Sequence, residues 1–277
     1  MIDALYSVPM WLLGVLIVGL SIVLSMLGLA VADRYVPAEA RRSHNDIAGY
    51  ISNIAAFVYA VLLAFLAVAV WQDYEKAQSI VQLEANAAGD VYRQAEGYPE
   101  PLRSQVRQDI RRYLDIVITE EWPLQARGGE SPIALETIEV LHRLLLTFEP
   151  TSERDRIVHT EQLGDMNALL DQRRNRIYAG ESGLQPVVWV VILAGSALIV
   201  AFCPFMGTLN HRAHFAMTAI LGASIGLVLF LIVALDRPFR GVGISPIAFV
   251  RVRDHTLVLP RGGLDPAPPA RGARGPR

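Results

Sequence analysis

Residues 48–71 read AGYISNIAAFVYAVLLAFLAVAVW and contain no charged side chain. A helix rises about 1.5 Å per residue, so about 20 apolar residues cross the roughly 30 Å hydrocarbon core of a bilayer. This stretch is therefore long enough to span a membrane. Beyond Asp73 the apolar residues Ala77, Val81 and Ala88 continue at helical spacing, which predicts that the helix extends out of the membrane into water.

Three more runs without charge predict membrane helices over residues 9–32, 186–208 and 215–235. For the first run the alternative is a cleaved signal peptide, which needs a basic start and an apolar stretch of roughly 7 to 15 residues. Residues 1–9 contain no Lys or Arg, and the apolar run is longer than that. We therefore expect the first run to be a retained membrane anchor.

The composition is typical of a membrane protein. Apolar residues make up 52% and charged residues 19% of the chain, against roughly 45–50% and about 25% in soluble domains. Cys203 is the single cysteine, which excludes a disulfide scaffold. The net charge of −2 provides no global basic surface, so no nucleic-acid partner is expected.

Residues 73–183 are polar but keep apolar side chains at helical spacing. Pro99 and Pro101 break the first helix of this region, Gly128–Gly129 marks a turn, and Ser152 suits the N-cap of the last helix. We therefore predict an all-α fold. Four transmembrane helices form two hairpins, residues 1–72 and 184–240, and a helical extramembrane domain, residues 73–183, is inserted between helices 2 and 3.

The C-terminal residues are predicted to form two parts. Residues 241–259 form a short element: Ser245–Pro246 suits a helix start, whereas Val250, Val252 and Val258 also permit a strand. Residues 260–277 are rich in Pro, Gly and Arg and lack an apolar period. We expect this segment to be a disordered tail.

Charge is distributed unevenly along the chain. Residues 73–183 contain 20 acidic and 13 basic residues, a net charge of −7. Such a surface would attract cations if it faced an ion path, and the alternative is an ordinary solvated surface. Basic residues near the membrane are more numerous on the side of the domain than in loops 33–46 and 209–214. The positive-inside rule therefore favours a cytoplasmic domain and cytoplasmic termini.

The second membrane helix carries a face of small and polar residues, namely Asp46, Gly49, Asn53, Ala56, Ala60, Ala64 and Ala67. We expect this face to turn inward, because close helix packing in lipid relies on small residues and polar contacts. The Asn53 amide needs a partner inside the hydrocarbon, either a neighbouring helix or a permeating ion. His44 and Asp46 lie at the mouth of the same helix, where the alternative role of Asp46 is a helix cap.

Glu84 falls within the apolar stripe of the helix extension. A buried carboxylate is costly unless it is paired or protonated. Arg173 and Arg176 are candidate partners for a structural ion pair, and the alternative is a titratable gate. The candidates for a pore or a polar network are therefore His44, Asp46, Gly49, Asn53 and Glu84.

Several short motifs follow one another along the chain: His44–Gly49, Tyr59–Phe65, Trp71, Tyr74, Ala77, Glu84–Ala85, Tyr113, Glu121–Trp122–Pro123, Arg173–Ile177, Pro186, Trp189 and Asp236–Arg237–Pro238–Phe239–Arg240–Gly241. Together they resemble the bestrophin-like family (domain of unknown function 4239) over roughly residues 10–250. The resemblance implies a bacterial multi-pass protein of the inner membrane. That protein is distantly similar to bestrophins, which are pentameric anion channels with a helical cytosolic part. The motif residues assigned to structure are Trp71, Glu121, Trp122, Asp236, Pro238, Phe239 and Gly241.

Two functions remain open. The first is an oligomeric channel in the lipid bilayer, whose second helix lines a path for a small inorganic ion. The second is a non-conducting membrane scaffold or sensor that acts through its helical domain. The sequence contains no HExxH, P-loop or GxSxG motif and no paired cysteines, so we expect no enzymatic activity, no metal site and no cofactor.

Overall fold

The computed structural model describes residues 8–35, 45–208, 210–240 and 243–258. Within these ranges it contains helices and no strand. The helices are α1 (Met10–Tyr35), α3 (Asn45–Gln94), η2 (Ala95–Gly97), α4 (Leu102–Ile116), the π-helical turn η3 (Val117–Glu121), α5 (Trp122–Gln125), α6 (Pro132–Leu146), α7 (Glu153–Glu181), α8 (Pro186–Phe202), η4 (Cys203–Phe205), α9 (His211–Asp236) and α10 (Ile247–Val258). The predicted all-α class is confirmed.

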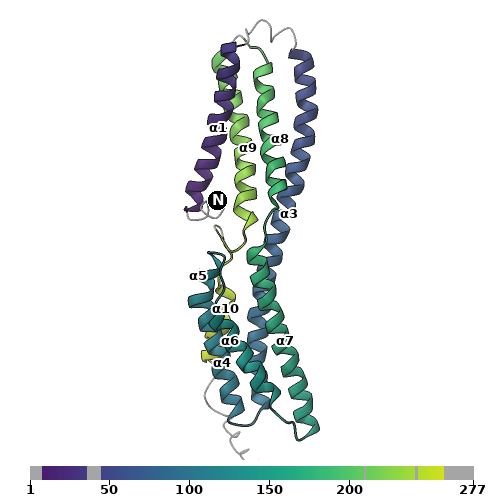
Figure 1. Cartoon of the computed structure of the whole chain (residues 1–277), viewed down its shortest axis with the longest axis vertical. Coiled ribbons are helices and arrows are strands. Elements are labelled where there is room, and N and C mark those ends of the chain that lie inside the picture. The colour runs from purple at the N-terminus through teal and green to yellow at the C-terminus, as the bar shows by residue number, and fades with distance from the viewer. Residues whose placement is uncertain (1–7, 36–44, 209, 241–242, 259–277) are drawn as a thin grey trace, which may run out of the picture.

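The molecule is elongated and has two halves stacked along its long axis (Figure 1). The membrane half contains α1, α8, α9 and the first part of α3. The domain half contains the rest of α3 with α4–α7 and α10. Four helices of the described chain are long and apolar enough to cross a membrane, and each overlaps one of the four predicted spans. His44, Gly241 and the predicted tail lie outside the described residues.

A single helix connects the two halves. α3 is 50 residues long, about 75 Å at the rise of an α-helix. Its first part packs in a membrane core that includes Tyr59, Leu63, Ile192 and Ile232. Its second part packs against α7 in a separate core of the domain half. The predicted extension of the second membrane helix out of the bilayer is therefore confirmed.

The membrane helices pair by close approach of small residues. α1 packs along α9, whereas α3 contacts α8 and α9. A Cβ atom added at Gly222 would lie 2.5 Å from the Ser25 Oγ, and one added at Gly226 would lie 2.9 Å from the Val18 Cα. Glycine is therefore required for this helix spacing, as in other membrane helix pairs. The partner of α1 is thus the last membrane helix rather than its neighbour in the sequence.

In the domain half, the residues that favour a helix cap or a turn lie at the ends of helices. Ser152 caps α7 in a capping box with Asp155, and Gly128 adopts φ +84° in the predicted turn. Residues 247–258 form a helix rather than a strand. α10 packs on α3 and α4, and its Phe249 is fully buried in the core of the domain half. Residues 247–258, which we predicted to belong to a separate C-terminal element, therefore pack as part of the helical domain.

Candidate functional site

One exposed stripe runs along the membrane part of α3. Its members are separated alternately by four and three residues from Asp46 to Ala64, and Trp71 follows seven residues later; all are exposed: Asp46, Tyr50, Asn53, Phe57, Ala60, Ala64 and Trp71. We call this set the α3 stripe. A repeat of 3.5 residues is the pattern by which helices pack around a common axis. The stripe contains both an amide and a carboxylate, in a segment long and apolar enough to span a membrane.

The side of α3 that packs inside the chain differs from the one we expected. Its residues are Ala55, Ala56, Tyr59, Leu62, Leu63, Leu66 and Val70. Tyr59 donates a hydrogen bond to the Ile192 carbonyl at 2.7 Å and pairs with the Ser196 hydroxyl at 2.6 Å. Asn53, Ala60 and Ala64 instead face out of the chain. Within a single chain these three residues therefore do not pack against a neighbouring helix, whereas Ala56 of the same small face does.

The start of α3 is fixed by Asn45. Its side chain donates to the Gly207 carbonyl at 2.9 Å and accepts from the Gly207 N–H at 2.8 Å. Gly49 lies beneath the Met206 side chain, since a Cβ atom there would be 3.9 Å from the Met206 Cε. Asp46 lies inside the first turn, because the helix begins at Asn45. A carboxylate in that position is favoured by the helix dipole.

Glu84 belongs to a fully buried ion-pair cluster in the domain half. Its carboxylate accepts hydrogen bonds from the Arg176 Nε at 2.6 Å and from the Tyr113 hydroxyl at 2.5 Å. The Arg176 Nη2 also donates to Glu121 Oε2 at 2.7 Å, and Arg173 pairs with the other oxygen of Glu121. Two carboxylates and two guanidiniums make the cluster electrically neutral. Of the two alternatives for Glu84, this geometry favours the structural ion pair over the titratable gate.

The surroundings shift the pKa values of two members of this cluster, Arg176 and Tyr113. Burial tends to lower the pKa of the Arg176 guanidinium, but Glu84, Tyr113 and Glu121 together raise it above its ordinary value. Arg176 therefore stays charged. Burial and the nearby Glu84 raise the pKa of the Tyr113 phenol well above its ordinary value, so it remains a hydrogen-bond donor. Gln125 completes the shell, accepting from the Arg176 Nη1 at 2.5 Å and donating to the Arg176 carbonyl at 3.0 Å.

A π-helical turn brings Glu121 into this cluster. Pro123 has no N–H group, so it cannot donate to the Thr119 carbonyl in the α-helical register. The helix widens over Val117–Glu121, and the Glu121 side chain is completely buried. Such turns are frequent at functional sites. The Trp122 side chain follows directly and lies beneath the Arg176 guanidinium, which is 5.5 Å from the ring centroid.

The motif residues after α9 join the two halves of the molecule. The Asp236 carboxylate accepts the Leu184 N–H at 2.6 Å and so ties the end of α9 to the start of α8. α9 ends at Asp236, shortly before Pro238, as predicted. The Phe239 ring stacks edge-on against Trp122, with 5.7 Å between centroids. The Trp122 Nε1 donates to the Ile244 carbonyl at 3.1 Å.

The candidates therefore separate into two places. Asp46 and Asn53 lie on the α3 stripe with Gly49 nearby, whereas Glu84 lies about 46 Å further along the same helix from Asn53. Trp71 is exposed at the domain-side end of the stripe. Tyr113, Gln125 and Asn45 were not among the candidates, although Asn45 and Tyr113 belong to quoted motifs. No group of three metal-ligating side chains occurs in the part of the chain that the structure describes.

A family model, the Bestrophin-like domain, matches residues 19–249. The chain belongs to the bestrophin-like family. It is a multi-pass membrane protein of that family. No curated protein matches its sequence.

Solved structures give the same fold at low sequence identity. A bacterial bestrophin homologue from Klebsiella pneumoniae is 12% identical, with a TM-score of 0.63 over 86% of this chain and 96% of that one. A mutant of a bacterial bestrophin homologue from the same organism is 14% identical, with a TM-score of 0.61 over 87% of this chain and 97% of the other. These likenesses establish the fold of the bestrophin-like chain.

Proposed function

We propose that this bestrophin-like protein is an oligomeric channel for a small inorganic ion, in which the α3 stripes of several copies surround a shared path. The observation that carries the proposal is Asn53. This amide lies in the membrane part of a helix long and apolar enough to cross a membrane, is exposed, and makes no hydrogen bond to any described residue. An unsatisfied amide in hydrocarbon costs several kcal/mol, roughly, so it requires water, an ion or another copy.

The rest of the stripe is consistent with a narrow path around a symmetry axis. Ala60 and Ala64 lie one turn apart and permit helices to approach closely. Asp46 lies two turns from Asn53 towards the end of the span, where a ring of carboxylates would concentrate cations. Asn53 offers both a carbonyl and an amino group, so it does not by itself select the sign of the ion.

The alternative is a non-conducting scaffold or sensor that acts through the helical domain. It is supported by the continuous helix α3, which joins the two halves, and by the neutral ion-pair cluster in the domain half. In that case the α3 stripe would be a dry contact between copies.

Ion flux separates the two functions. Purified protein in liposomes should conduct, and Asn53→Leu should abolish the flux because it replaces the polar group of the stripe with a branched apolar side chain. Asn86→Leu, the same substitution at an exposed position of α3 in the domain half, is the matched control and should conduct normally. A stable oligomer that passes no ion in any salt would instead favour the scaffold.

We also propose that the protein lies in the bacterial inner membrane with its termini and helical domain in the cytoplasm. This orientation rests on the distribution of basic residues and the positive-inside rule. Green fluorescent protein fused after Arg277 should fluoresce, because it matures in the cytoplasm, whereas alkaline phosphatase at the same position should be inactive. Active phosphatase with a dark fluorescent fusion would reverse the orientation.

A further inference from the structure

The domain half has two open flanks, one on each side of α3. α7 packs against α3 and α6, whereas α10 packs against α3 and α4. Figure 1 shows α7 on one side of α3 and α10 on the other. In the proposed channel α3 faces the central axis, so both flanks face neighbouring copies of the chain. A contact between the flanks therefore rests on that proposed arrangement, but not on ion conduction.

The flank formed by α7 carries a stripe with the same spacing as the α3 stripe. Its members are separated alternately by four and three residues, and all are exposed: Ile157, Glu161, Gly164, Ala168, Asp171, Asn175 and Tyr178. We call this set the α7 stripe. Its ends are large side chains, whereas a Cβ atom added at Gly164 in the middle meets nothing within 4 Å. A repeat of 3.5 residues with a small centre is suited to contact with another helix.

The α7 flank is acidic. Glu161 is exposed and forms no ion pair with any described residue. Burial raises the pKa of the Asp165 carboxyl, and the nearby Asp90 and Glu161 raise it further. Arg93 pairs with Asp90 and offsets this effect only in part. Three carboxylates and one guanidinium leave this part of the flank with a net negative charge.

The α10 flank carries the opposite charge. Arg251 is exposed and has no ion pair within the described part of the chain, and His255 is exposed one turn further along. Asp254 is the only acidic residue of α10, and it lies 3.1 Å from Arg253. Arg253 also lies 3.7 Å from Asp115. Arg251 is therefore available to a carboxylate of another molecule.

The opposite charges lie at the same level along α3. On one flank the Tyr92 hydroxyl donates to the Thr256 carbonyl at 3.1 Å. On the other flank the Gln162 amide donates to the Val91 carbonyl at 3.0 Å. Tyr92 and Val91 are consecutive residues of α3, so the end of α10 and the lower part of α7 meet α3 at one level.

Two charged positions follow from these contacts. His255 precedes Thr256 and Glu161 precedes Gln162, so His255 and Glu161 are level with each other on opposite flanks. Arg251 lies one turn nearer the membrane than His255. It is level with the part of α7 that follows Glu161, because α7 and α10 run in opposite directions along α3.

Apolar side chains match at a second level, closer to the membrane. The Arg176 guanidinium lies 5.7 Å from the centroid of the Phe249 ring, so this part of α7 is level with the start of α10. Tyr178 and Ile247 each lie two residues nearer the membrane than these two residues. They are 62% and 54% exposed. The two flanks therefore offer an apolar side chain and a charged group at matching levels.

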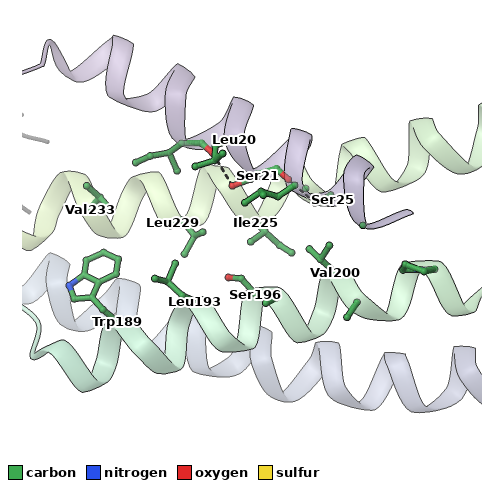
Figure 2. Close-up of a pocket in the computed structure, with 17 residues that line it drawn as sticks. Leu20, Ser21, Ser25, Trp189, Leu193, Ser196, Val200, Ile225, Leu229 and Val233 are labelled. Carbon is green, nitrogen blue, oxygen red and sulfur yellow. Dashed lines mark hydrogen bonds between the residues drawn. The ribbon is translucent and has the colours of Figure 1, made fainter. Parts of the chain in front are cut away.

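The open surface of the membrane half provides no such match. Figure 2 shows an apolar groove between α1, α8 and α9. Its Ser21 and Ser25 hydroxyls donate to carbonyls of their own helix, and its Ser196 hydroxyl pairs with Tyr59. An apolar surface accepts many neighbours in many registers, whereas opposite charges select the partner and fix the register. The flanks of the domain half are therefore the surfaces that can align neighbouring copies.

We propose that the α7 stripe of one copy packs against α10 of the next copy around the axis. Glu161 then faces Arg251 and His255, and Tyr178 lies beside Ile247. Each copy contributes one flank of each kind, so the contact is heterologous and closes into a ring. Rotation about an axis along α3 causes no shift along that axis, so residues at one level meet. A second copy is favoured over an unrelated protein because one chain carries both complementary surfaces at the same levels.

Cross-linking of cysteines in membranes tests this contact. Tyr178→Cys and Ile247→Cys are combined in the full chain with Cys203→Ser, and membranes are treated with a short bismaleimide. The double variant should give a ladder of linked copies on a denaturing gel. Each single variant should remain monomeric, because neither residue meets its own counterpart in a heterologous contact. Ile247→Cys with Gly164→Cys is the matched control. Gly164 lies on the same stripe but about 21 Å further from the membrane, so this pair should not link.

Charge reversal tests the electrostatic part of the contact. Arg251→Glu, added to the double-cysteine protein, places like charges opposite each other and should lower the yield of linked copies about tenfold. Adding Glu161→Arg to that variant reverses both charges and should restore the yield. Arg143→Glu is the matched control, because it reverses an exposed arginine of α6 that lies on neither flank, and it should link normally.

Three results would overturn the proposal. The first is linking of a single-cysteine variant, which would indicate a two-fold contact between identical surfaces. The second is a double variant that has the mass of an oligomer but gives no ladder. In that case the copies meet elsewhere and the proposed channel stands without this contact, whereas a monomer by mass would remove both. The third is an equal yield of linked copies from the Arg251→Glu and Arg143→Glu proteins.

Discussion

At the scale of single residues, Arg176 is the side chain on which the domain half depends most. It is completely buried and bonds to Glu84, Glu121 and Gln125. Removing one partner of a buried ion pair costs about 3–5 kcal/mol, because it leaves an uncompensated charge in the interior. We expect Arg176→Met to lower the free energy of unfolding by about that amount, measured by thermal or denaturant unfolding in detergent.

Two comparisons isolate the charge effect. Arg174→Met, two residues away, removes an exposed arginine that is 3.6 Å from Asp171, and it should cost less than about 1 kcal/mol. Adding Glu84→Gln to Arg176→Met returns the cluster to neutrality, so the double variant should be more stable than Arg176→Met alone. Strictly additive destabilisation by the two substitutions would contradict a coupled cluster.

The sequence predicts part of this site but not its connections. Glu84 was conspicuous because a carboxylate interrupts an apolar stripe, and Arg176 was one of two candidate partners. Gln125 gave no such signal, because a glutamine near a turn is ordinary. Tyr113 and Glu121 were found only by resemblance. Its burial depends on the π-helical turn over Val117–Glu121, which shifts the register of the apolar stripe.

At the scale of helices, the contact between α1 and α9 depends on glycine. A Cβ atom at Gly222 would lie 2.5 Å from the Ser25 Oγ and 2.9 Å from the Ser21 carbonyl. Gly222→Val should therefore push α1 away and cost about 1–3 kcal/mol, the usual range for overpacking. The measurement is the thermal midpoint of the purified protein in detergent.

Gly19→Val is the matched control, because an added Cβ at that α1 position meets nothing within 4 Å. It should leave the midpoint almost unchanged. Equal effects of the two valines would mean that the contact between α1 and α9 does not depend on the close approach at Gly222.

The positions of the helices could be predicted from the sequence, but the pairing of the helices could not. Charge-free runs and the 3.6-residue period identified all four spans and the extension of α3, since both depend on local sequence. Pairing of α1 with α9 joins segments about 200 residues apart, and the period of one helix does not identify its partner. The small face of α3 shows the same limit. Small residues predict close packing, but they do not say whether the neighbour belongs to the same chain.

At the scale of the whole molecule, the proposed channel brings the exposed α3 stripe against other copies of the chain. Tyr50 and Phe57 are 72% and 71% exposed in a single copy, next to the unpartnered Asn53. In the proposed oligomer, the repeat of 3.5 residues would bring the same stripe of several copies together around one axis, and closed rotational symmetry would give each copy the same contact. The mass of the purified protein should therefore be a multiple of 30.5 kDa, measured by light scattering with the detergent subtracted.

Disulfide trapping tests whether α3 is the element at that axis. Cys203 is the single cysteine, so Cys203→Ser gives a background without thiols. In that background Ala60→Cys should form a disulfide between copies when membranes are oxidised, because Ala60 lies in the middle of the stripe and neighbouring copies bring it within bonding distance. Leu198→Cys, on a 64% exposed position of α8, should stay monomeric on a non-reducing gel. An oligomer that is trapped through Leu198→Cys and not through Ala60→Cys would place α8, rather than α3, at the axis and would remove Asn53 from any shared path.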